Sequence, residues 1–128
     1  QDLRGADRAD VLSAVRADGL TLRNVDALTR ADEDVVRVAV QQNGLALKFA
    51  HSDLQADRDM VLAAVRQDGR SLAHASQKLR ASRDVVFAAV LQHGLALEFA
   101  SESLRADRGV AMAAVSQDGY ALKFVCPA

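Results

Sequence analysis

The sequence predicts an all-α protein, an α-solenoid of about five helix-turn-helix repeats with 25 residues each. Three observations support this prediction: pairs of residues that end in glycine, a column of alanines, and apolar residues at helical spacing. The glycine pairs recur every 25 residues without insertion or deletion: Asp18-Gly19, Asn43-Gly44, Asp68-Gly69, His93-Gly94 and Asp118-Gly119. Each copy of the repeat therefore solves the same packing problem.

The repeat implies one helical-repeat domain over residues 1–128. This length is ordinary for a single domain. The copies span about 7–31, 32–56, 57–81, 82–106 and 107–128. One copy cannot bury its apolar face alone, so neighbouring copies are expected to stack. The chain is either complete or a piece of a longer array, and the sequence leaves both open.

The first half of each copy is predicted to be a helix of about eleven residues. In the copy at 57–81, Asp57 is placed to cap the helix and Asp59 lies in the first turn, where the helix dipole favours negative charge. Ser82 takes the cap position in the fourth copy. An apolar face at helical spacing follows, formed by Met60, Val61, Ala64 and Val65. Gly69 is then expected to adopt the left-handed conformation that ends a helix.

The second half of each copy is ambiguous between strand and helix. Leu45, Leu47 and Phe49 alternate as in a strand, but Leu45 and Phe49 are also spaced as neighbours on one helix face. A helix is preferred because alanine, a good helix former and a poor strand former, fills one column. That column is Ala50, Ala75 and Ala100. The strand alternative is a leucine-rich horseshoe, which would need an Asn or Cys column that the sequence lacks.

Small residues predict close packing between the copies. One column is alanine throughout: Ala14, Ala39, Ala64, Ala89 and Ala114. Small side chains let neighbouring helices approach closely. Both terminal copies depart from the pattern, as terminal repeats should: Asp10 is polar where the other copies are apolar, and Cys126-Pro127 interrupts the second helix of the last copy.

Charge and composition exclude several classes of function. The formal net charge is −1, from 16 Lys and Arg against 17 Asp and Glu, which weighs against generic binding to nucleic acid or anionic membranes. No apolar run approaches the roughly 18–20 residues of a membrane span. We therefore expect a soluble protein that makes no direct membrane insertion and has no signal peptide in this chain, while its compartment stays open.

The sequence offers no chemistry that outweighs a structural role. His51, His74 and His93 lie in different columns, and the lone Cys126 excludes a disulfide framework or a cysteine-based zinc site. The regularly spaced glycines do not form a phosphate loop. We therefore predict that the protein is not an enzyme and has no catalytic residues, no metal site and no cofactor.

A column of arginines follows the predicted caps, and aspartates follow the arginines in turn. The arginines are Arg8, Arg58, Arg83 and Arg108. One interpretation is a charged ridge that recognises a partner. The preferred interpretation is helix capping with ion pairs between copies, because the charges lie where helix starts favour them.

Four positions break their columns and are the candidate partner-binding residues. Arg37, Arg70 and Tyr120 stand where most other copies are apolar, and Leu91 stands where the others are polar. Such breaks are where a repeat stack differentiates a binding surface, although each also fits drift at a half-exposed position.

The run L-x-A-D-R-D-V-V-x-A-A-V-x-Q-D/N-G-x-A-L-x-F-A-S is found at Leu79–Ser101 and, less perfectly, at Leu54–Ser76. It resembles the repeat of the family called domain of unknown function 4116. The resemblance covers essentially the whole chain and implies tandem helical repeats. It implies no activity and no catalytic residues. The departures are Glu33 for the Arg, Gly109 for the second Asp and His74 for the Phe.

These observations favour a helical-repeat scaffold or structural subunit that mediates protein–protein interaction in a larger assembly. Two alternatives stay open. The first is a nucleic-acid-binding repeat array, suggested by repetition and 13 arginines but opposed by the balanced charge. The second is a non-catalytic targeting region of a larger enzyme or bacterial effector. The expected partner is a protein and not a nucleic acid.

Overall fold

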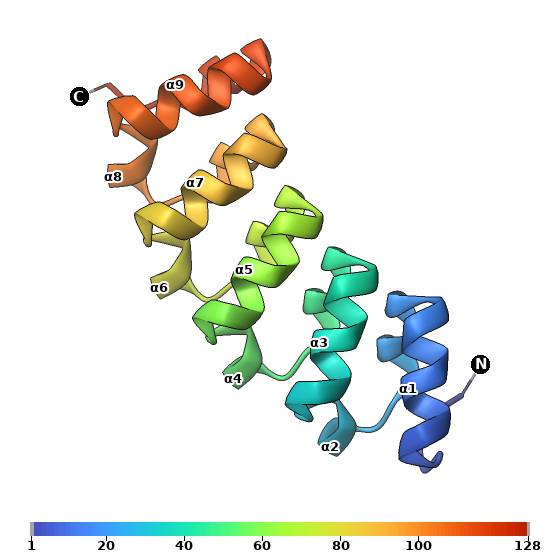
Figure 1. Ribbon diagram of the computed structural model, residues 1–128. Helices are drawn as coiled ribbons and strands as arrows, with labels where there is room; N and C mark the ends of the chain where they lie inside the picture. Colours follow the sequence, from blue (N-terminus) through green and yellow to red (C-terminus); the bar gives the residue numbers. More distant parts are fainter. Residues whose placement is uncertain (1, 128) are drawn as a thin grey trace.

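The computed structural model describes residues 2–127, which form an all-α repeat stack as predicted (Figure 1). Each unit begins with a ten-residue α-helix, followed by a six-residue 3-10 helix. A four-residue α-helix then connects the unit to the next. The long helices are α1 (Arg8–Ala17), α3 (Glu33–Gln42), α5 (Arg58–Gln67), α7 (Arg83–Gln92) and α9 (Arg108–Gln117).

The two shorter kinds of helix follow in the same order. The 3-10 helices are η1 (Gly19–Asn24), η2 (Gly44–Phe49), η3 (Gly69–His74), η4 (Gly94–Phe99) and η5 (Gly119–Phe124). The short connecting helices are α2 (Ala27–Arg30), α4 (Ser52–Gln55), α6 (Gln77–Arg80) and α8 (Glu102–Arg105). Cys126 and Pro127 follow η5, where the other units have their connecting helix.

The units stack in chain order as a solenoid. Figure 1 shows the long helices side by side in one row, each turned a little further in the same sense than the one before. Each long helix packs against the next, and each 3-10 helix packs against the next in a second row. All closely packed pairs of elements belong to the same unit or to adjacent units. The contacts are therefore those of a nearest-neighbour stack.

The predicted second helix of the repeat is divided into two pieces. Gly44, Leu47 and Ala50 are spaced by three residues and are all buried. Three residues per turn is the period of a 3-10 helix, and this spacing aligns the three on one side. Ala50 itself has extended backbone, which ends η2 before the short helix α4 begins. The residues described contain no strand, so the horseshoe alternative is wrong.

The repeated glycines have a different role from the one predicted. Only Gly5 has a positive φ among the described residues, so Gly69 does not end α5 in the left-handed conformation. Asp68 ends the helix with extended backbone, and its side chain accepts a hydrogen bond from the Arg70 N–H at the start of η3. A Cβ at Gly69 would lie under 3.0 Å from the Ala89 carbonyl oxygen of the next unit. Glycine is needed because two backbones meet there.

The core runs without interruption along the stack. The alanine column lies at the junctions between units, and from the second unit onward it is fully buried. The leucines of the 3-10 helices, Leu22, Leu47, Leu72 and Leu97, are likewise 0 % exposed. The small alanines and the large leucines thus belong to one continuous close-packed core.

The caps of the long helices mostly follow the prediction. Asp32, Asp57 and Asp107 each accept a hydrogen bond from a backbone N–H in the first turn. Ser82 does not: its hydroxyl donates to the Asp84 carboxylate, which itself accepts from a backbone N–H of α7. Ser82 therefore stands at the N-cap position, as predicted, but makes no side-chain cap hydrogen bond, because its hydroxyl binds Asp84 instead.

Candidate interaction surfaces

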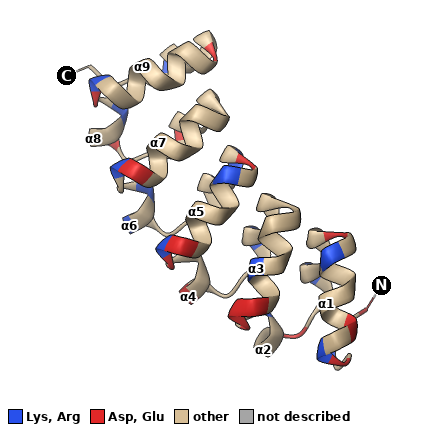
Figure 2. Cartoon of the chain, in the orientation of Figure 1, with Lys and Arg blue, Asp and Glu red and all other residues tan. Residues whose placement is uncertain are grey.

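Charged residues gather at the start of the long helices (Figure 2). Arg8 pairs with Asp32 of the following unit, with 3.0 Å between Nε and Oδ2, and Arg83 pairs with Asp107 at the same distance. Arg58 pairs with Asp84 in the corresponding place. These pairs join consecutive units, as the capping interpretation predicts. They leave these arginines and aspartates committed to the fold rather than to a partner.

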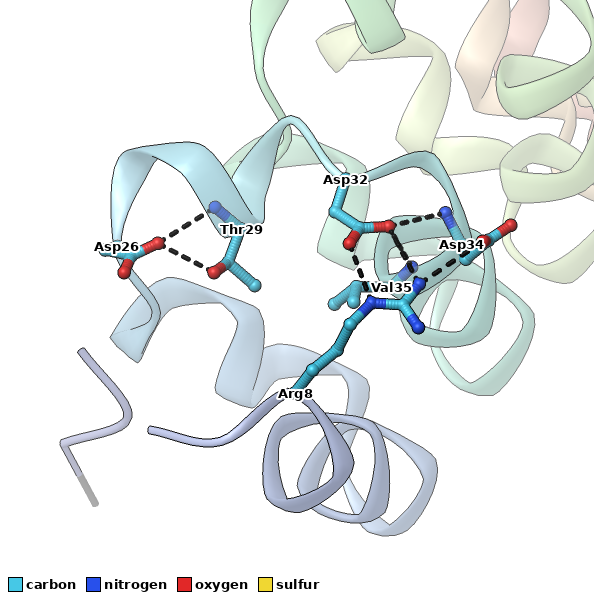
Figure 3. Close-up of polar contacts among 6 residues, drawn as sticks. All are labelled: Arg8, Asp26, Thr29, Asp32, Asp34 and Val35. Atoms are coloured by element: carbon cyan, nitrogen blue, oxygen red, sulfur yellow. Dashed lines mark hydrogen bonds and ion pairs between the residues drawn. The ribbon is translucent and has the colours of Figure 1, made fainter. Parts of the chain in front are cut away.

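Figure 3 shows how one carboxylate serves two purposes. Oδ1 of Asp32 accepts from the N–H groups of Asp34 and Val35 at the start of α3, while Arg8 binds the same carboxylate from the preceding unit. The hydrogen bond from Arg8 is the main cause that lowers the pKa of Asp32. Because both groups are partly solvated, such a pair contributes about 0–1 kcal/mol to stability.

The series of ion pairs between consecutive units is interrupted at the second unit. Glu33 stands where the other units have Arg, and it pairs with Arg37 one turn later in α3, at 2.6 Å between Oε1 and Nη2. The candidate residue Arg37 is therefore held within its own helix. The junction between the second and third units lacks the ion pair that the neighbouring junctions have.

The four predicted binding residues fall into two groups. Arg70 and Tyr120 begin the 3-10 helices η3 and η5, in the same column. Arg37 and Leu91 lie instead on the long helices α3 and α7, which α5 separates. Tyr120 and Leu91 are 81 % and 57 % exposed. The four residues therefore do not form one site, and only Arg70 and Tyr120 share a row.

A groove crosses the row of 3-10 helices from η2 to η5, with a volume of about 490 Å³. Its apolar lining comes from Leu45, Leu95, Phe99 and Phe124, and its charged lining from Arg70, Glu98 and Lys123. Ala73, His74 and His93 complete it. The second to the fifth units all contribute residues to this groove. Of the four candidate partner-binding residues, Arg70 is the one that lines it.

Sequence reasoning missed the aromatic part of this groove. Phe99, Phe124 and His74 share one column, which the sequence suggests only as half-buried packing. In the structure these rings are half-buried against the core and also line the groove. Burial, assisted by the positive charge of Lys48, lowers the pKa of His74 below its ordinary value of 6.5. The recurrence of Phe99, Phe124 and His74 in one column could have predicted this surface, because stacked units bring equivalent residues side by side.

A second hollow, of about 540 Å³, lies on the row of long helices, beside α7. It is lined by Arg83, Asp84, Phe87, Ala88 and Leu91. The Arg83 guanidinium lies over the Phe87 ring, 5.5 Å from its centre. The Arg83 guanidinium therefore contacts both the Phe87 ring and the Asp107 carboxylate. Leu91 is the exposed large apolar side chain of this hollow.

Among residues 2–127, no three His, Cys, Asp or Glu side chains are grouped as a metal site would require. Within the same part of the chain, no helix has the length and apolar character needed to cross a membrane.

Taken together, the stacked units define an α-solenoid with a multi-unit groove. The model of one family, described as domain of unknown function (DUF4116), matches three overlapping or adjoining segments, at residues 7–55, 32–80 and 82–128. The chain therefore belongs to the DUF4116 family, which confirms the resemblance seen in the sequence. Searches of the curated proteins and of the solved structures found no match.

Proposed function

We propose that this protein is a non-enzymatic helical-repeat scaffold that binds a protein partner along the groove of its 3-10 helices. The observation that carries this proposal is the continuity of the groove across η2 to η5. A surface built by successive units is the extended binding surface that solenoids offer. The charged residues at the junctions are paired across two units, whereas Arg70 of the groove is paired with Asp68 in its own unit, at 2.6 Å between Nη2 and Oδ2.

The lining of the groove fits an extended polypeptide segment. Phe99 and Phe124 provide aromatic surface, which together with arginine is enriched at protein interfaces. Arg70 and Glu98 place opposite charges in the same groove. A segment that alternates apolar residues with residues of both charges would satisfy these groups. The 3-10 helices η2, η3 and η4 each pack against a neighbouring 3-10 helix on both sides, so this part of the groove is preorganised for binding.

The charge distribution favours a protein over a nucleic acid as the partner. Glu98 lies between basic groups that a phosphate backbone would otherwise use, and the chain has a formal net charge of −1. A reader of nucleic acid needs a continuous basic stripe, and its affinity falls steeply with salt.

The proposal is tested by affinity capture from the cells that produce the protein, with and without nuclease treatment. The groove variant combines Arg70→Glu with Lys123→Glu, both on exposed side chains that line the groove. The matched variant combines Arg37→Gln with Leu91→Ala on the row of long helices. We expect a stoichiometric partner that survives nuclease, is retained by the matched variant and is lost by the groove variant. Partners that disappear with nuclease, or that both variants retain equally, would contradict the proposal.

A further inference from the structure

The last unit exposes an apolar side. In every earlier unit, the equivalent side is covered by the unit that follows. We call this the C-terminal face; it comprises Arg108, Met112, Val115, Leu122 and Val125, which surround a hollow of about 490 Å³. Leu122 is 65 % exposed and Met112 is 57 % exposed. The equivalent leucines of the earlier units are 0 % exposed. This surface is separate from the groove of the 3-10 helices.

The inner junctions show what covers such a face. First, the following unit supplies a carboxylate to an arginine, as Asp32 does to Arg8. Second, a glutamine Oε1 accepts from the glycine N–H: Gln42 does so for Gly19 at 2.6 Å, and Gln92 for Gly69 at 2.8 Å. These contacts come from the cap position and from the last turn of the following long helix.

The third contact is a close approach of two backbones. The carbonyl oxygen of an alanine in the following unit comes so near the glycine that a Cβ there would lie under 3.0 Å away. This holds at Gly19, Gly44, Gly69 and Gly94. The alanine belongs to the invariant column at the junctions.

The C-terminal face holds the same three groups without these partners. Among residues 2–127, Arg108 has no ion-pair partner and nothing lies within 4 Å of a Cβ placed on Gly119. Gly119 has an ordinary backbone conformation, because Gly5 is the described glycine with positive φ. An alanine at position 119 would therefore be tolerated in the chain by itself.

We propose that the C-terminal face binds a further 25-residue unit of the same kind, supplied to it in the register of the inner junctions. The incoming unit places an aspartate on Arg108, a glutamine on the N–H of Gly119 and an alanine carbonyl against the Gly119 Cα. The proposal rests on continuity with the inner junctions and on the charge of Arg108, and it is independent of the function proposed for the groove.

The N-terminal side of a second copy of this chain is a poor occupant. Asp10 stands where Val35, Met60, Val85 and Val110 are fully buried in the other units. Stacking a second copy on the C-terminal face would bury this carboxylate without a cationic partner. Ala17 also stands where the other units carry glutamine, and Gln42, Gln92 and Gln117 each accept from a glycine N–H. A unit that fits the C-terminal face has an apolar residue at the position of Asp10 and a glutamine at the position of Ala17.

The test extends the chain by one unit in register, with a copy of residues 101–125 joined directly after Val125. This copy repeats the aspartate and glutamine that bind Arg83 and Gly94 in the junction before it. We expect amide hydrogens of the added long helix to be protected from exchange, and the unfolding midpoint to rise. Gly119→Ala in the extended chain should reduce the protection of the added unit at least about tenfold, because the carbonyl approach is blocked. The same substitution in the unextended chain should leave its midpoint unchanged.

Two outcomes would overturn the proposal. One is an added unit that exchanges as freely as an unfolded segment while the first five units remain protected. The other is protection that Gly119→Ala leaves intact, because the unit would then be docked by different contacts. Sedimentation of the unextended chain tests the remaining occupant: a stable dimer that Leu122→Asp abolishes and Gly119→Ala does not would assign the face to a second copy instead.

Discussion

The two ends of the stack are the two sides of one repeat, yet their surfaces are opposite in character. The N-terminal side carries Asp10, Ser13, Ala17 and Thr21, which are polar or small and accessible to water. The C-terminal face carries Met112 and Leu122, which are as apolar as the residues buried inside. The comparison teaches that a few substitutions, without a change of fold, decide whether one side of a unit is polar or apolar. The first unit differs from the others at its outer side, while the last unit carries the inner pattern.

The largest expected effect is a loss of stability when a buried leucine is shortened, compared with an exposed leucine of the same column. Leu72→Ala removes a side chain that is 0 % exposed and leaves a cavity, so we expect a loss of about 3 kcal/mol in the free energy of unfolding. Leu122→Ala, at 65 % exposure, should cost less than about 0.5 kcal/mol. Urea unfolding measures both. Equal losses would show that Leu122 is covered in solution.

Overpacking of a junction should have the next largest effect. Ala64→Leu forces a larger side chain into a fully buried junction and is expected to cost about 1–3 kcal/mol. Ala14→Leu introduces the same side chain at the accessible N-terminal side, where we expect a change below about 0.5 kcal/mol. Thermal melts of both variants make the comparison. A neutral Ala64→Leu would refute the assignment of the alanine column to the junctions.

A buried hydroxyl group offers a gain in stability. Ser71 is 0 % exposed and its Oγ has no hydrogen-bond partner, whereas the other buried residues of its column are alanines. Ser71→Ala should therefore stabilise the protein by about 1 kcal/mol. At the N-terminal side, Thr21 occupies the same column, and its Oγ1 donates to the Asp18 carbonyl oxygen at 2.8 Å. Thr21→Ala should give no such gain in the same melts.

The smallest effect is a pH dependence that arises in the middle of the stack. Burial lowers the pKa of His74 in the folded protein, so between the folded and the unfolded value the unfolded chain binds more protons. Stability should consequently fall as the pH decreases below about 6.5, and the loss should be complete below the folded pKa.

His74→Phe isolates this contribution, because Phe124 fills the same column at the end of the stack and His51 and His93 are retained. The difference in unfolding midpoint between wild type and variant should be greater at about pH 5 than at about pH 8. A constant difference at both values would rule out titration of His74 as the cause.

The sequence predicted the parts of the fold that depend on period. The long helices, their starts and the alanine junctions all follow from residues that recur at fixed spacing, such as Asp57 and Ala64. The same spacing predicted that glycine recurs but could not show which structural role requires it. Gly69 fits a left-handed helix end and a close approach of two backbones equally well, and only the position of Ala89 in the next unit decides between them.

The helical character of the second half of the repeat was predicted, but its division into two helices was not, because its buried positions follow more than one period. Leu45 and Phe49 fit an α-helix, while Gly44, Leu47 and Ala50 fit the tighter 3-10 helix that the structure contains. A short apolar segment carries too few residues to separate these periods.

The structure places the four candidate binding residues in two separate rows of helices. A break in a column marks an unusual residue but not the direction in which it points, so Arg37 and Leu91 were grouped with residues of the other row. Arg70 is the candidate residue that lines the groove. The rings of Phe99 and Phe124 keep to their column and so gave no signal of their own, although they line the same surface.

The nearest-neighbour packing of the units has a mechanical consequence. Because closely packed elements belong to the same or adjacent units, a force applied between the two ends is carried by the junctions in series. Among residues 2–127, no closely packed pair of elements joins units that are not adjacent, so no such contact shares this load. A unit of 25 residues that unfolds would become a segment of up to about 85 Å of extended chain. Under force, the units would therefore unfold one at a time, each adding a similar length to the chain.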